Sequence, residues 1–220
     1  MAQEIAKQAT DLIGWINNHG KVRKIFDAAQ RQVSKDRINK ELVLAYLIAN
    51  LTRWTTHCTA FIRLHNIQDA LKLAVMQNRT GLVQAQVRAA KSSEARRLTE
   101  DADSHIKIIQ DHTFWAGLEQ VIGDIELICY ATNINQTDAC HPDSVLRTLA
   151  GIYLHFLDHP EVDVSVKITQ RIEKRWKAAY QPLFLLCQIL NPFEGLSRFG
   201  DKANLSCLKC EALLMEVSLK

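Results

Sequence analysis

The sequence predicts an all-α protein, an irregular bundle of about eight to ten helices. Nearly every apolar segment repeats with steps of three and four residues, which is the spacing of one face of an α-helix. The chain shows no alternation of strand and helix patterns, no glycine-rich phosphate loop and no internal repeat. Hydrophobic residues make up 47% of the 220 residues, which is enough for a packed core and too much for a disordered chain.

The first third of the chain is expected to contain three helical stretches. Residues 5–18 form the first, which Gly20 terminates because glycine readily adopts a left-handed conformation. A second helix runs from about residue 22 to residue 33, and the polar residues 34–40 are predicted to be a loop. Residues 41–65 follow as a helix or a pair of helices around which the chain is organised.

Within that third stretch, residues 51–57 divide the helix into two unlike faces. Apolar residues at helical spacing include Leu51, Trp54, Cys58 and Phe61. Arg53 and His57 fall on a different face, where they offer a cation and a hydrogen-bond donor. From spacing alone, Trp54 is a core tryptophan and the cations are solvated.

The middle of the chain continues the helical pattern. Asn66 is predicted to cap a helix whose buried side includes Leu71, and residues 78–81 interrupt it. Residues 82–97 have a thin apolar stripe and are expected to be an exposed arm or a helical connection. Residues 99–110 form a further helix with an acidic start.

The last hundred residues contain four more helical patterns. A long amphipathic helix begins at Thr113 and ends in a polar break at residues 133–138, and Pro142 opens the next helix. Residues 162–179 alternate briefly like a strand but continue at helical spacing, so a helix is preferred. Pro182 ends it, residues 183–190 are buried, residues 193–205 form a loop, and residues 208–219 form a last helix.

The charge distribution points to local basic clusters rather than to a dedicated nucleic-acid module. The net charge is only +3. One cluster holds Lys21, Arg23 and Lys24; another holds Lys174, Arg175 and Lys177. Each cluster is either a solvated helix face or a set of phosphate contacts.

Several classes of protein are disfavoured by what the sequence lacks. No run of apolar residues is long enough for a transmembrane helix, and the start has no signal-peptide pattern, so we expect an intracellular protein without a membrane partner. Cys207 and Cys210 form a lone Cys-x-x-Cys pair, and a zinc site needs a second pair, so no metal is expected.

Three stretches carry a recognisable set of motifs in order. The first is Thr52-Arg53-Trp54-Thr55-Thr56-His57. The second is Phe114-Trp115 with the following apolar stripe and the polar break. The third is Arg175-Trp176 with Tyr180, then an apolar run into Leu190-Asn191-Pro192. Together, over residues 20–193, they resemble the hAT superfamily of DNA transposases, especially the transposase-derived proteins of fungal genomes.

The resemblance implies a position within a larger fold. The first stretch is similar to the family's Thr-Arg-Trp-Asn-Ser signature, and the family usually has Leu-Asp-Pro where this chain has Leu190-Asn191-Pro192. That signature lies in an all-helical insertion within an RNase H-like domain. We therefore expect a fragment without the β-sheet core, with residues 1–192 as the helical domain and residues 193–220 as a loop and truncated helix.

The resemblance also bears on catalysis. The parent family uses an Asp-Asp-Glu triad with Mg²⁺ or Mn²⁺, and two-metal phosphoryl transfer needs several converging carboxylates. The strands that carry the aspartates are absent, and the only late candidates for the glutamate are Glu211 and Glu216, whose flanks do not match. The chain is therefore predicted to be catalytically incomplete, not an enzyme, with no cofactor or small-molecule substrate.

Two functions remain open from the sequence. In the first, a transposase-like fragment of nuclear location keeps residual DNA binding, and oligomerises if at all through regions missing here. Its DNA-contact candidates are Arg53, Trp54, His57, Lys21, Arg23, Lys24, Lys174, Arg175 and Lys177. Arg53 would contact phosphate, and Trp54 would stack on an unpaired base. In the second, the chain is a helical protein-interaction scaffold with no nucleic-acid role.

Overall fold

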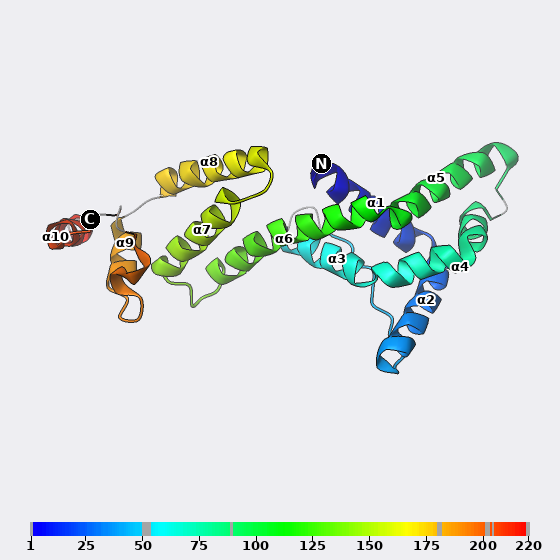
Figure 1. Ribbon diagram of the computed structural model, residues 1–220, viewed down its shortest axis with the longest axis horizontal. Helices are drawn as coiled ribbons and strands as arrows, with labels where there is room; N and C mark the ends of the chain where they lie inside the picture. Colours follow the sequence, from blue (N-terminus) through cyan, green and yellow to red (C-terminus); the bar gives the residue numbers. More distant parts are fainter. Residues whose placement is uncertain are drawn as a thin grey trace. The chain divides into compact units, whose positions relative to one another are not determined.

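The computed structural model describes residues 2–49, 54–88, 90–179, 182–200, 203 and 205–218, without the side chains of Trp54 and Ser93. Within these residues every regular element is helical, which confirms the all-α class (Figure 1). The elements are α1 Ala2–Asn18, α2 Gly20–Ile38, α3 Trp54–Asn66, α4 Gln68–Val87, α5 Ser92–Gln110, α6 His112–Asn135, α7 Pro142–Leu157, α8 Val162–Ala179, α9 Pro182–Ile189, the 3₁₀ turn η1 Gly195–Arg198 and α10 Cys207–Ser218.

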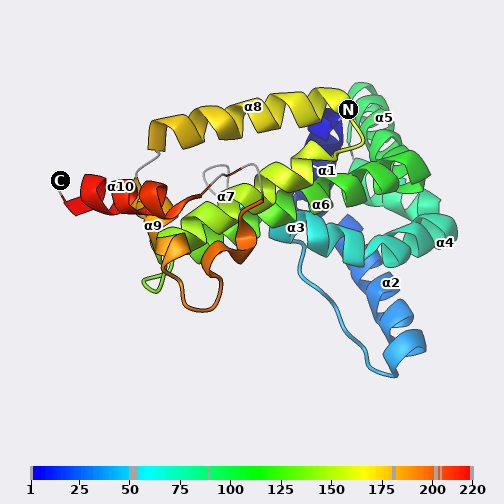
Figure 2. The same cartoon turned by 60° about the vertical axis from the view of Figure 1, so that its left-hand side comes forward.

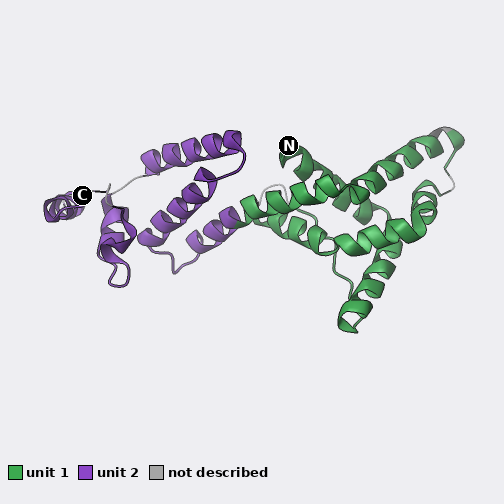
Figure 3. Ribbon diagram, viewed as in Figure 1, with its two compact units in different colours: residues 1–126 green, residues 127–220 purple. Residues whose placement is uncertain are grey.

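The chain divides into two compact units (Figure 3). The first unit comprises residues 1–126 and the second residues 127–220, so the division falls within α6. It lies inside the range 1–192 that the sequence predicts as one helical domain. That domain assignment, like the predicted origin in an RNase H-like fold, stays a prediction.

The first unit is built around a large apolar core. Side chains from α1, α2, α3, α4, α5 and α6 meet in it. Its most fully buried members include Leu12, Ile16, Phe26, Phe61, Leu64, Leu71, Leu82, Ile106 and Leu118. Helix α6 approaches α1 closely at Gly117, where an added Cβ would come within 3.0 Å of Ile5. The apolar residues that repeat at helical spacing in residues 5–18 and at the start of α6 are therefore the residues that pack in the core.

Residues 41–49 correct the sequence prediction, because they form no helix and run as an extended connection after α2 (Figure 2). The buried amide of Gln30 donates from Nε2 to the Leu44 carbonyl at 3.2 Å and accepts from the Leu44 amide at Oε1 at 2.8 Å. Asn17 Nδ2 donates to the Tyr46 carbonyl at 3.1 Å. Side-chain amides thus satisfy the backbone of this segment, and they override its local preference for helix.

The extended conformation of residues 41–49 allows the Tyr46 side chain to be buried. Its ring is buried, and its hydroxyl accepts a hydrogen bond from Gln30 Nε2 at 2.8 Å. Burial raises the pKa of the Tyr46 hydroxyl, with a smaller opposing effect of the Gln30 hydrogen bond. The segment therefore inserts one aromatic side chain into the core.

Several helix boundaries also differ from their predictions. Gly20 does not end α1 in a left-handed conformation but is the first residue of α2. Helix α2 continues to Ile38, through residues predicted to be a loop, because those polar residues form an exposed helical end that Asn39 closes with φ of 52°. Asn66 ends α3 rather than capping α4, since Ile67 occupies the N-cap position without a side-chain cap. Polar composition alone did not distinguish a solvated helix from a loop.

Helix α4 contains the predicted interruption, but the residues after it are not an exposed arm. Asn78 has non-helical angles of φ −143° and ψ 41°, and an added Cβ on Gly81 would overlap the Asn78 side chain. Beyond this kink, Leu82 and Gln86 are buried. Trp15 Nε1 donates to Gln86 Oε1 at 2.6 Å, so a polar residue in a thin stripe has a core partner.

The second unit buries far fewer apolar side chains than the first. Pro142 stands in the first turn of α7 as predicted, and residues 162–179 are helical as preferred. Helices α7 and α8 lie side by side as an antiparallel hairpin in both views (Figures 1 and 2). Among its described residues, the buried apolar side chains are those of Cys129, Ala131, Phe156, Pro182 and Leu186.

Candidate nucleic-acid interface

The centre of the predicted interface falls largely outside the described residues. Arg53 is not among them, and Trp54 is described only as the first residue of α3. The remainder of α3 has the two faces expected, because Cys58 and Phe61 are buried while His57 is half-buried. The His57 ring meets Phe61 edge-on, with the ring centroids 6.0 Å apart.

The first basic cluster stands at the start of α2. Lys21 and Lys24 are exposed, whereas Arg23 is partly covered. The guanidinium of Arg23 lies 5.4 Å from the Tyr46 ring centroid, and its Nε lies 3.9 Å from Asp27 Oδ2. Arg23 thus has partners inside its own unit, and Lys21 and Lys24 remain as the available cations of this cluster.

Lys21 and Lys24 lie at the N-terminus of α2, which itself attracts anions. The first turn of α2 contains no acidic residue, and the N-cap residue His19 makes no side-chain cap hydrogen bond. Unpaired amide groups and the helix dipole both favour an anion at such an end. Lys21 and Lys24 add to this field, so the first turn of α2 is suited to attract a phosphate.

The second basic cluster belongs to α8. Lys174, Arg175 and Lys177 are all exposed, and none forms an ion pair with another described residue. Trp176 points away from most of them and is half-buried, with its ring centroid 6.0 Å from that of Phe184. At 3.6 residues per turn, Lys174 and Arg175 share a face with Arg171, whereas Lys177 lies one turn after Glu173.

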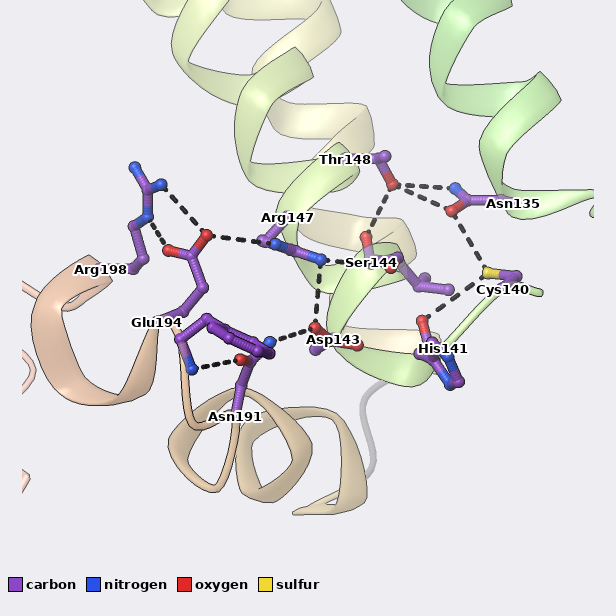
Figure 4. A network of polar contacts seen from close by, with 12 residues as sticks. Asn135, Cys140, His141, Asp143, Ser144, Arg147, Thr148, Asn191, Glu194 and Arg198 are labelled. Carbon is purple, nitrogen blue, oxygen red and sulfur yellow. Dashed lines mark hydrogen bonds and ion pairs between the residues drawn. The ribbon is translucent and has the colours of Figure 1, made fainter.

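A network of hydrogen bonds and ion pairs in the second unit includes Asn191, where the third motif ends (Figure 4). Arg147 of α7 joins two acids, with Nη2 at 3.1 Å from Asp143 Oδ2 and Nη1 at 3.4 Å from Glu194 Oε1. Arg198 also bonds Glu194, and this hydrogen bond lowers the pKa of the Glu194 carboxyl. The network ties the segment after α9 to the first turns of α7.

Asn191 occupies the place where the resembled family usually has aspartate. Its Nδ2 donates to Asp143 Oδ2 at 3.0 Å, and its Oδ1 accepts from the Phe193 amide at 3.0 Å. An aspartate could accept the second hydrogen bond but could not donate the first to an ionised carboxylate. The partnership with Asp143 is therefore a physical reason for asparagine here, and it joins residues 48 positions apart, which no local pattern indicates.

The described residues contain no group of three or more His, Cys, Asp or Glu side chains that could hold a metal ion. Cys207 and Cys210 stand in α10, and Glu211 and Glu216 are exposed on the same helix. None of the described helices is long and apolar enough to cross a membrane. The expectation that the chain lacks a catalytic centre stays a prediction.

Sequence reasoning missed the buried polar side chains that organise the first unit. Gln30 and Gln86 are buried and make paired hydrogen bonds, although glutamine in a helix usually indicates a solvated face. The only signal was position, since Gln30 lies four residues after Phe26 on the buried side of α2.

Comparison of the chain with protein-family models, with curated proteins and with solved structures finds no significant match.

Proposed function

We propose that the chain is the helical insertion region of an hAT transposase-like protein and that it contacts DNA, with α8 supplying phosphate contacts. The proposal keeps the nuclear location expected from the sequence. It is supported by the ordered motifs: Trp54 of the Thr-Arg-Trp element is the first residue of α3, and the Arg175-Trp176 pair stands on α8.

The observation that carries the proposal is the row of exposed cations on α8. Arg171, Lys174 and Arg175 lie on the side of the helix away from Trp176, and none is in an ion pair with another described residue. Several arginines elsewhere in the described residues pair with carboxylates, as Arg79 does with Asp103 at 2.9 Å. Cations left without an internal partner are suited to neutralise phosphates and release counterions.

The proposal is tested by measuring DNA affinity against salt concentration. Replacing Arg171, Lys174 and Arg175 with glutamine should lower the slope of log K against log salt by about 2–3, because each phosphate contact contributes about 0.9. The control replaces three exposed cations of the first unit with glutamine, which is an equal change of net charge: Lys91 just before α5, and Arg97 and Lys107 within it.

The two variants separate a specific face from a general charge effect. A loss confined to the α8 variant supports the proposal, and an equal loss in both variants, or none in either, contradicts it. Trp54→Ala sharpens the test: if Trp54 stacks on a base, binding to DNA with unpaired bases falls by about 1–3 kcal/mol while the melting midpoint is retained. Arg53→Ala should lower the salt slope by about one.

The alternative function, a helical interaction scaffold, rests on a different surface. An open apolar groove lies between α7 and α8, and exposed apolar side chains continue it. Such a surface suits a protein partner more than a phosphate backbone. If both α8 and Trp54 variants bind DNA as the parent chain does, this alternative replaces the proposed function.

A further inference from the structure

The α7–α8 hairpin carries a groove that its own helices leave open. The groove has a volume of about 350 Å³ and is lined by Leu149, Tyr153 and Leu154 of α7 and by Ile172 and Trp176 of α8. Its one charged lining residue is Glu173, which accepts a hydrogen bond from the Tyr153 hydroxyl at 3.2 Å. The groove is therefore lined by apolar side chains, except where the hydrogen-bonded pair Tyr153 and Glu173 supplies a polar position.

Exposed apolar side chains extend the groove toward the turn of the hairpin. Leu154 is 60% exposed, Leu157 49%, Val162 73% and Val166 45%. Leu157 follows Tyr153 by four residues, and Val166 precedes Glu173 by seven, so helical spacing places both on the side of the groove. We name the groove together with these four side chains the hairpin face. An apolar face of this kind marks an interaction site.

The two ends of the hairpin face carry opposite charges. Asp158 and Glu161 stand at the turn, and Lys177 stands at the far end of α8, one turn after Glu173. The turn is well defined, because the Glu161 amide donates to His159 Nδ1 at 3.0 Å and the His159 ring stacks on Phe156. The acidic end and the basic end are therefore held apart along one face.

This distribution of charge indicates which kind of partner fits the hairpin face. A nucleic acid would be repelled by the acidic turn, and a uniformly acidic protein segment would be repelled there as well. A copy of the same face, turned end for end, brings each acidic turn against a basic end while the apolar side chains meet in the middle. Such an arrangement is the isologous contact of a two-fold dimer.

We propose that the hairpin face is a self-association surface, on which a second copy of this chain docks with its hairpin antiparallel to the first. This inference is independent of the proposed DNA contact, since Arg171, Lys174 and Arg175 are spaced away from the Trp176 side and only Lys177 of the α8 cations adjoins the hairpin face. The dimer would leave those cations available on both copies.

The test measures the mass of the full chain by analytical ultracentrifugation under reducing conditions, over a range of protein and salt concentrations. The parent chain should dimerise, and Leu154→Glu should abolish dimerisation because a charge would enter the apolar centre. Met76→Glu, at a 76% exposed position of the first unit, is the matched control and should leave the dimer intact. Circular dichroism checks that each variant is folded.

Charge exchange tests the antiparallel arrangement even if Leu154→Glu fails to fold. Asp158→Lys alone and Lys177→Glu alone should each weaken dimerisation about tenfold, because each places like charges opposite one another twice. The double variant Asp158→Lys/Lys177→Glu, and an equal mixture of the two single variants, should restore it. A chain that is monomeric throughout, or a double variant no better than the singles, would overturn the inference.

Discussion

The two units of the chain use apolar residues in opposite ways. The first buries its large side chains, and among its described residues the strongly exposed large apolar ones are Ile38, Leu42, Ile48 and Met76. The second unit buries few. It exposes Tyr130, Leu154, Leu157, Val162, Val166, Leu183, Leu190, Phe193, Leu196, Leu208, Leu214 and Met215. The comparison teaches that the first unit is stabilised by its own core, whereas the second presents apolar surface for further contacts.

Truncating one apolar side chain in each unit is the strongest test of this comparison. Phe26→Ala should lower the free energy of unfolding by about 3–5 kcal/mol, because Phe26 is fully buried in the core. Leu154→Ala should cost less than about 1 kcal/mol in a monomeric sample, because the side chain is mostly exposed. Chemical denaturation of both variants gives the two values, and equal costs would break the comparison.

Removing the Gln30 amide tests whether the first unit depends on polar contacts as well. Gln30→Ala should cost about 1–3 kcal/mol, because the Leu44 backbone groups and the Tyr46 hydroxyl lose their partner. Gln32→Ala on the exposed side of α2 is the control and should be nearly neutral. If denaturation shows the same stability for both variants, the amide does not hold the extended segment in place.

The smallest expected effect is a pH dependence in the second unit. Arg198 and Arg147 lower the pKa of Glu194 in the folded state. A group whose pKa is lowered by folding binds fewer protons when folded, so its contribution is present above the ordinary glutamate pKa. The contribution is lost as the pH falls through the lowered pKa.

Thermal unfolding of the parent chain and Glu194→Gln between neutral and acidic pH measures this contribution. The melting temperatures should differ near neutrality and converge as the medium becomes acidic. Glu211→Gln, on the exposed side of α10, serves as the comparison variant. A difference that grows toward acidic pH would have the wrong sign and would show that the Glu194 ion pairs do not stabilise the unit.

The helical class and most helix positions followed from apolar spacing, because that spacing reflects which side chains can share a core. Residues 162–179 illustrate this, since helical spacing over five turns outweighs a brief alternation. Residues 41–49 illustrate the limit. Their composition favours helix, and the hydrogen bonds that hold them extended come from Asn17 and Gln30, which are distant in sequence.

The candidate site was predictable only as a set of exposed cations. Helical spacing put Lys174 and Arg175 on a solvated face, and both are exposed. Sequence could not show that Arg23 would lie over the Tyr46 ring, because Tyr46 reaches it through the unexpected extended segment. The role of Asn191 was equally hidden, since its partner Asp143 belongs to another helix.

The extended segment 41–49 has a consequence for how the chain tolerates changes of length. Ordinary surface connections accept insertions and deletions because their backbone makes few fixed contacts. Here the backbone of Leu42 is held by Ser34, that of Leu44 by Gln30 and that of Tyr46 by Asn17. Removing one residue between these points would move a backbone group out of reach of its side-chain partner. In its tolerance of insertions and deletions, this connection should therefore behave like a regular element rather than like a loop.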